Sequence, residues 1–128
     1  MRKHFVFSAM PVMILVILGL LVTGRASSQT MPSGTQQTQL TIVNNTGYTI
    51  WYAYISPSTD NEWGPDRLAG DQIINNRESV TLNLLLPVAE RYDIMLEDSD
   101  GDTYTKGNLR ITANTRIVFT FDDFDDTD

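Results

Sequence analysis

The sequence predicts an all-β fold, a single small antiparallel β-sandwich of about six to eight strands preceded by an N-terminal signal helix. Three observations predict it. Short β-branched and aromatic segments alternate with turn signals, no window shows a sustained helical period with caps, and the chain opens with an apolar run typical of export signals. The length of 128 residues allows one domain.

The N-terminal segment, residues 1–28, has the pattern of a secretory signal peptide. A basic start is followed by an apolar run over residues 5–22, and Ala26 and Ser28 occupy the two small-residue positions of a cleavage site. The pattern predicts cleavage before Gln29 and a protein that is secreted or periplasmic.

An uncleaved membrane anchor is the alternative interpretation of this segment. A spanning helix needs about 20 apolar residues, whereas this run is slightly shorter and contains Pro11. The chain has no cysteine to carry a lipid anchor. Cleavage is therefore favoured, with no stable insertion in the membrane afterwards.

Residues 29–128 are strongly acidic. They contain all 16 acidic residues but only six of the nine basic ones, which gives a formal charge of −10. A negative surface repels nucleic acid and anionic lipid, so neither is an expected partner. Because cysteine is absent, the core, a bound ion or oligomerisation must stabilise the exported domain.

The predicted sandwich domain, residues 38–124, lies between a polar linker at 29–37 and an acidic tail at 125–128. Turn signals separate its six or more expected strands, which include residues 38–45, 48–56, 79–86, 91–98, 103–111 and 115–123. This spacing is typical of a β-sandwich or a barrel.

The second expected strand, residues 48–56, is apolar on both faces, which predicts a central strand covered on both sides. We expect Trp51 to lie in the core. The loop over residues 57–71 is rich in turn formers. Trp63 and Leu68 are expected to pin this loop to the core.

The stretch EDSDGDTY is a candidate hairpin turn. Asp-Gly is a preferred pair for a two-residue type I′ turn, and Asp100 and Gly101 fit these positions. The resulting register faces Ser99 with Asp102, Leu96 with Thr105, Ile94 with Gly107 and Tyr92 with Leu109. It sends Tyr104 to the outer face and makes Glu97 and Lys106 diagonal neighbours.

The acids of this stretch are also candidate calcium ligands. A helix-loop-helix calcium loop ends in a glutamate, and neither alignment of the stretch supplies it. Asp98, Asp100 and Asp102 nevertheless alternate near the turn, and a hard cation would relieve the repulsion between their charges. We favour the plain turn and keep weak calcium binding as the alternative; no other cofactor is expected.

The C-terminal stretch DDFDDTD is expected to be a solvated acidic tail. Phe124 is unusual in such a segment and is a candidate for closing the core. A second cation site is the less favoured alternative.

No catalytic motif is found in residues 29–128. They contain neither histidine nor cysteine, which leaves no Ser-His or Cys-His nucleophile and no soft ligand for zinc, copper or iron. Paired carboxylates can serve a glycosidase, but so small a domain offers little room for a substrate cleft. We therefore expect no enzymatic activity.

Aromatic residues are concentrated near the start of the domain. Such side chains fill a core, stack on sugar rings or anchor a protein partner. Tyr52 and Tyr54 are expected to be more exposed than Trp51, because tyrosine tolerates a wet hydroxyl end. Together with Trp63 they are the candidate ligand-binding residues.

Several motifs resemble a group of small, poorly characterised domains of exported bacterial proteins. The group shares Asn-x-Thr-Gly-Tyr-Thr-Ile, Ser-Pro-Ser, Trp-Gly-x-Asp, Gly-Glu-Ser-Val and Tyr-Asp-(Ile/Leu) elements, the last ending in Asp-x-Asp-Gly. They match residues 44–50, 56–58, 63–66, 78–80 and 92–101. Arg77 stands where the group usually has glycine, and the cysteines of some members are missing. The resemblance covers most of residues 40–111 and implies a β-sandwich in the cell envelope, without a particular activity.

The Asn-Asn start and the aromatic strand also resemble thaumatin-like sandwiches, whose cysteines this chain lacks. The sequence as a whole predicts an exported, non-catalytic binding or interaction module whose partner is an envelope protein or a glycan. The alternatives are a carbohydrate-binding module that uses the aromatic strand and a structural envelope protein that assembles through sheet edges.

Overall fold

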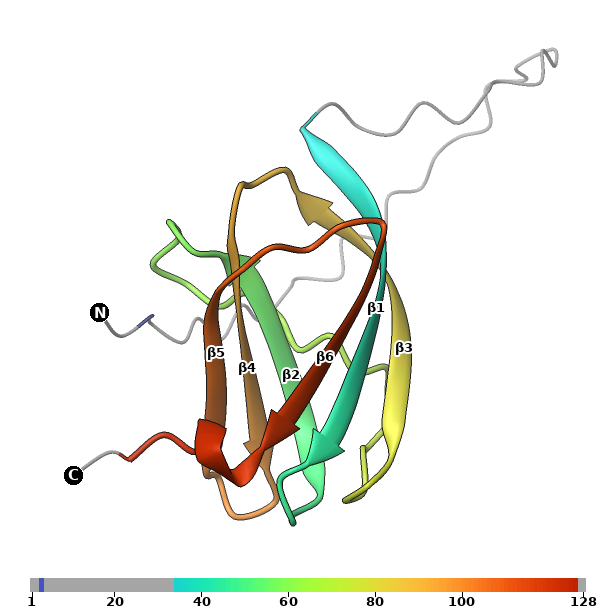
Figure 1. Cartoon of the computed structure of the whole chain (residues 1–128), viewed down its shortest axis with the longest axis vertical. Helices are drawn as coiled ribbons and strands as arrows, with labels where there is room; N and C mark the ends of the chain where they lie inside the picture. Colours follow the sequence, from blue (N-terminus) through green and yellow to red (C-terminus); the bar gives the residue numbers. More distant parts are fainter. Residues whose placement is uncertain (1–2, 4–33, 127–128) are drawn as a thin grey trace, which may run out of the picture.

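The computed structural model describes Lys3 and residues 34–126, which form two packed three-stranded sheets (Figure 1). The elements are β1 (Thr35–Asn45), β2 (Ile50–Pro57), β3 (Ser79–Pro87), β4 (Tyr92–Asp98), β5 (Thr103–Leu109), β6 (Asn114–Thr120) and a short 3-10 helix, η1 (Phe121–Asp123). The predicted all-β sandwich is confirmed. The predicted signal helix, apart from Lys3, lies outside the described residues, and no helix within them is long and apolar enough to cross a membrane.

One sheet has the strand order β3-β1-β6 and the other has the order β2-β4-β5. All neighbouring strands are antiparallel except β1 and β6, which are parallel. The parallel pair departs from the purely antiparallel expectation. It is possible because β6 reaches β1 from the other sheet by a crossover, not by a hairpin (Figure 1).

The core lies between the two sheets. Alternate side chains of each strand point into it, as expected for packed sheets, and the fully buried ones include Leu40, Ile42, Ala53, Leu86, Tyr92, Ile94, Leu96, Tyr104 and Phe119. Burial of one such large apolar side chain contributes about 1.5–3 kcal/mol. This core stabilises a chain without disulfides.

Strand β1 begins at Thr35, so its first three residues belong to the segment that was predicted to be a linker. Thr35, Gln36 and Gln37 pair with the last three residues of β3. The Gln36 side chain also donates a hydrogen bond of 2.6 Å to the Tyr92 hydroxyl. Polar composition suggested a linker, but backbone pairing requires no apolar side chain.

Strand β2 is an edge strand, so the expectation of a central strand was wrong. Its two faces are both largely buried because the loop that follows it folds back over the sheet. Trp63 and Leu68 of this loop are only 7% and 5% exposed. The prediction that these two residues pin the loop is confirmed.

Hydrogen bonds from the following loop close the free edge of β2. The Asp66 carboxylate accepts hydrogen bonds of 3.0 Å from the amides of Ala53 and Leu68. The Arg67 amide donates to the Ala53 carbonyl at 2.7 Å. The edge is therefore covered by the protein's own loop, which satisfies backbone groups that would otherwise attract another strand.

The hairpin between β4 and β5 forms where it was predicted, but with a different turn. Gly101 has a φ of +83°, and its amide donates to the Asp98 carbonyl at 3.1 Å. Asp100 is not among the described residues with positive φ, which a type I′ turn requires. The loop therefore has three residues and a glycine bulge, and the type I′ assignment was wrong.

This turn shifts the register by one residue. Leu96 pairs with Tyr104 instead of Thr105, and a shift of one residue turns each side chain to the opposite face. Tyr104 is consequently fully buried, not outward-facing. Lys106 forms an ion pair of 3.0 Å with Asp123, not a pairing with Glu97.

A bulge further along β5 restores the predicted pairing of Tyr92 with Leu109. Ile94 was expected to pair with Gly107 but pairs with Lys106. Asn108 lies at this bulge with a φ of +57°. The bulge changes the course of β5 beside Asp93, which matters for the site described below.

The C-terminal segment packs against β5. The Phe124 ring contacts the Tyr104 ring at a centroid distance of 5.7 Å, as expected for a residue that closes the core. Asp125, the first residue of the predicted tail, donates its amide to the Thr103 carbonyl and accepts a hydrogen bond of 2.8 Å from the Thr103 hydroxyl. The acidic segment thus pairs with the free edge of β5 through Asp125.

Candidate binding site

The outer face of the β2-β4-β5 sheet points away from the other sheet and carries a second apolar cluster. Tyr54 of β2, Met95 of β4 and Trp63 of the following loop form it and are all buried. Tyr54 and Met95 are register partners. The loop therefore places Trp63 on a face that the sheet itself supplies.

The structure brings the three predicted ligand-binding residues together on this face. The rings of Tyr52 and Tyr54 are stacked with a centroid distance of 6.3 Å, and Trp63 belongs to the same cluster as Tyr54. Only Tyr52 is exposed, at 39%. The expected exposure of Tyr54 was wrong, because Trp63 and Met95 pack on it.

Trp51 is 48% exposed, so its expected place in the core was also wrong. The pairing between β2 and β4 is irregular between Ile50 and Tyr52. A bulge inserts an extra residue and breaks the alternation of faces. Trp51 and Tyr52 are both exposed as a result.

Asp93 is a central residue of the outer face that sequence reasoning missed. Its Oδ1 atom accepts hydrogen bonds from the Ser58 hydroxyl at 2.6 Å and from the Asn108 amide at 2.9 Å. Burial opposes ionisation, but the bonds from Ser58, Asn108 and Lys3 outweigh it and lower the pKa of Asp93. A Cβ on Gly107 would lie 3.3 Å from the same oxygen, so glycine leaves the space that this carboxylate occupies.

The second carboxylate oxygen of Asp93 holds the ammonium group of Lys3 at 2.9 Å. The same nitrogen lies 2.8 Å from the Ser56 hydroxyl oxygen, 2.9 Å from the Pro57 carbonyl oxygen and 4.7 Å from the centre of a Trp63 ring. The Lys3 side chain is only 7% exposed. Three oxygens and an aromatic face thus surround one buried cation.

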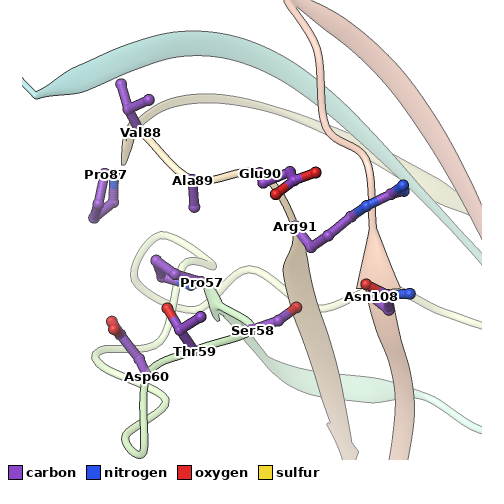
Figure 2. A pocket seen from close by; sticks show the side chains of 10 residues that line it. All are labelled: Pro57, Ser58, Thr59, Asp60, Pro87, Val88, Ala89, Glu90, Arg91 and Asn108. Carbon is purple, nitrogen blue, oxygen red and sulfur yellow. The ribbon is translucent and has the colours of Figure 1, made fainter.

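A pocket of about 460 Å³ adjoins this site at the end of the sandwich (Figure 2). Its wall comes from the end of β2 and the residues after it, from the end of β3 and the β3–β4 connection, and from Asn108 of β5. Ser58 lines the pocket and also donates to Asp93. Such a volume lies within the usual range of ligand pockets, about 300–1,000 Å³.

Acidic groups lie close to one another near the outer face. Burial raises the pKa of Glu97, and the charges of Asp98 and Asp66 raise it further. Burial and the charges of Glu97 and Asp66 raise the pKa of Tyr54, which keeps its phenol neutral. A face with these groups suits a positively charged ligand.

The three candidate calcium ligands meet at the opposite end of β4. Carboxylate oxygens of Asp98, Asp100 and Asp102 lie within 4.8 Å of one another. Asp98 is only 2% exposed and accepts bonds from the amides of Asp100 and Asp102 and from the Tyr104 hydroxyl, at 2.9, 3.1 and 3.1 Å. Its carboxylate therefore has an evident role in the turn, and calcium binding stays a prediction.

Comparisons with known proteins add one distant likeness. No protein-family model and no curated protein matches the chain. The chain is similar to the NMR structure of a protein from Eubacterium rectale, with 13% identity and a TM-score of 0.47 over 71% of this chain and 84% of that one.

Proposed function

We propose that this chain is an exported, non-catalytic binding module of the cell envelope that recognises a protein partner with the outer face of its β2-β4-β5 sheet. The observation that carries this proposal is the arrangement around Asp93. A carboxylate held by two hydrogen bonds lies between an aromatic cluster and an open pocket. Binding sites commonly combine apolar walls with a few fixed polar groups.

The exposed aromatic residues support a protein partner. Trp51 and Tyr52 lie next to each other on the bulge of β2, and both present a large part of their surface to solvent. Tryptophan and tyrosine are enriched among the residues that dominate the binding energy of protein interfaces.

A carbohydrate is the second candidate, and the exposure of Trp51 favours it. An exposed indole provides a flat apolar face on which a sugar ring can stack. A glycan array with the exported protein separates the two candidates. Saturable glycan binding that is lost in Trp51→Ala would support the carbohydrate function and contradict the protein-binding one.

The direct test of the first candidate is retention of envelope proteins on the immobilised exported protein. We expect an envelope protein to be retained by binding that is saturable and that free exported protein competes for. This retention should be lost with Tyr52→Ala but not with Leu85→Ala. Leu85 is an exposed residue of β3 on the other sheet and serves as the matched control. Equal loss with both variants, or with neither, would contradict the assignment of the outer face.

Intact-mass measurement of the exported protein tests the envelope assignment. Cleavage before Gln29 is expected, because Ala26 and Ser28 precede that bond at the positions that signal peptidase requires. An exported chain that retains Met1 would show that residues 1–28 serve as an anchor.

A further inference from the structure

We propose that Asp93, Ser56, the Pro57 carbonyl and Trp63 form a receptor for the ammonium group of a lysine side chain on a polypeptide. In the unprocessed chain this receptor holds Lys3; after removal of residues 1–28 it takes a lysine of the partner. The inference rests on the proposed binding function and names the chemistry that the site recognises.

The geometry around Lys3 is that of a complete ammonium site. A primary ammonium has three N–H groups, and its nitrogen has three oxygen neighbours at 2.8–2.9 Å, one each from Asp93, Ser56 and Pro57. The Trp63 ring adds a cation–π contact at 4.7 Å. Every donor of the cation therefore has an acceptor, which is required for a charge to be buried.

The receptor is built from groups that do not depend on Lys3 for their positions. Ser56 and Asp93 are register partners on β2 and β4. The carboxylate of Asp93 is oriented by Ser58 and the Asn108 amide, and Trp63 is packed in the outer cluster. Departure of Lys3 leaves these supports in place, so the site is preorganised for another ammonium group.

The donor set selects a primary ammonium over other cations. Calcium needs six to eight oxygen ligands, whereas this site presents three and an aromatic ring. Arginine binds best through a planar fork to a carboxylate, whereas these oxygens surround a single atom. A quaternary ammonium keeps the cation–π contact but cannot donate to Ser56 or Pro57.

Two observations favour a lysine on a polypeptide over a free amine. The group that fills the site is itself a lysine side chain of a polypeptide, Lys3. The adjoining pocket shares Pro57 with the receptor and is also lined by Ser58, which donates to Asp93; Figure 2 shows both residues at its wall. This pocket offers about 460 Å³ for residues that flank the lysine.

The test is a titration of the exported, processed protein with an N-acetylated peptide of residues 1–5, in which Lys3 carries the only primary amine. Binding is followed through the indole N–H signal of Trp63 by NMR. A lysine and its nearest flanking atoms, about thirteen non-hydrogen atoms at a typical ligand efficiency, give an expected Kd of about 1 mM. If export leaves residues 1–28 attached, the titration is made on the full chain carrying Lys3→Gln, whose receptor is open.

Matched peptides test the chemistry. We expect peptides with Lys3→Gln, Lys3→Arg or trimethylated Lys3 to bind at least about tenfold more weakly, because each loses charge-assisted hydrogen bonds. Cadaverine, a free diamine, is expected to bind more weakly than the peptide. Equal binding of the Lys3→Gln peptide would overturn the receptor, and equal or tighter binding of cadaverine would overturn its assignment to a polypeptide.

Matched protein variants test the site. Asp93→Asn should weaken peptide binding at least about tenfold, whereas Glu62→Gln, the same charge change at an exposed position beside Trp63, should not. Asparagine can still accept from Ser58, and an unchanged thermal midpoint checks that the fold is retained. Ser56→Ala provides a second, uncharged variant with a smaller expected loss.

Unchanged peptide binding by Asp93→Asn and Ser56→Ala would overturn the inference. The two proposals fail separately. If an envelope protein is retained in a Tyr52-dependent manner but the lysine peptide does not bind, the binding function stands and the ammonium receptor falls. If neither the peptide nor an envelope partner binds, both fall.

Discussion

At the scale of single residues, carboxylates that accept several hydrogen bonds position the surrounding backbone. Asp98 accepts three hydrogen bonds at the β4–β5 turn, and Asp66 accepts two from backbone amides beside β2. One of the acids in EDSDGDTY, Asp98, thus has a structural role in the turn. Asp100 and Asp102 are exposed.

Asp98→Ala should lower the free energy of unfolding by roughly 2–3 kcal/mol, because two turn amides and the Tyr104 hydroxyl lose a charged acceptor. Asp100→Ala, an exposed control in the same turn, should change it by less than about 0.5 kcal/mol. Denaturant titration measures both. Equal effects of the two variants would show that Asp98 has no special role.

Calcium should have little effect on stability if the turn is the whole function of these acids. Melting curves in chelator and in millimolar calcium are expected to coincide. If calcium binds only the folded state, a free calcium concentration of ten times the Kd would raise the free energy of unfolding by about 1.4 kcal/mol. A calcium-dependent rise that Asp100→Asn abolishes would instead identify Asp98, Asp100 and Asp102 as a metal site.

Glu97→Gln should stabilise the protein at pH 7, by about 0.5 kcal/mol because the group is partly exposed. The folded-state pKa of Glu97 lies above its ordinary value of 4.5, since burial and the charges of Asp98 and Asp66 disfavour its ionised form. The free energy of unfolding therefore falls as the pH rises from the ordinary pKa to the pKa of the folded state, because the unfolded chain ionises first. The advantage of the variant should disappear below pH 4.5 in denaturant titrations at several pH values, and a constant advantage would contradict the electrostatic cause.

At the scale of elements, strand positions were readable from the sequence but strand registers were not. β-branched and aromatic segments between turn signals indicated six strands, the hairpin at Gly101 and the burial of Trp63 and Leu68. An Asp-Gly pair, however, is compatible with a two-residue turn and with a three-residue loop. The difference of one residue decides whether Tyr104 is buried or exposed.

The faces of β2 could not be predicted for a related reason. Its bulge lies between Ile50 and Tyr52, and its free edge next to that bulge is held by Asp66, which lies in a loop thirteen residues beyond Ala53. The candidate site is equally non-local, because Lys3, Ser56, Trp63 and Asp93 come from four separate parts of the chain. No local pattern marks Asp93, although the Tyr-Asp-Ile motif contains it.

Asp66→Ala should destabilise the fold by roughly 1–3 kcal/mol, because two amides lose their acceptor. It should also increase hydrogen exchange at the Ala53 and Leu68 amides while leaving the β1–β3 pair protected. Exchange measured by NMR gives both results. A uniform increase over both sheets would show that Asp66 contributes only to global stability.

At the scale of the whole molecule, the two sheets present different outer surfaces. The β2-β4-β5 sheet carries the aromatic cluster, the fixed carboxylate of Asp93 and the adjoining pocket. The β3-β1-β6 sheet carries polar pairs such as Thr41 and Thr81, whose hydroxyls lie 2.9 Å apart. The loop after β2 and the segment at Asp125 cover the two edges of the β2-β4-β5 sheet. The outer face of this sheet, not its edges, is therefore the surface proposed for recognition.

The most direct measurement of this claim is photo-crosslinking in cells of the organism that encodes the chain. A benzophenone amino acid replaces Tyr52 on the outer face or, as control, Leu85 on the other sheet; these side chains are 39% and 51% exposed. The account predicts a discrete adduct with an envelope protein from position 52 and none from position 85. An adduct confined to position 85, or none from position 52 while the protein is exported and folded, would contradict it.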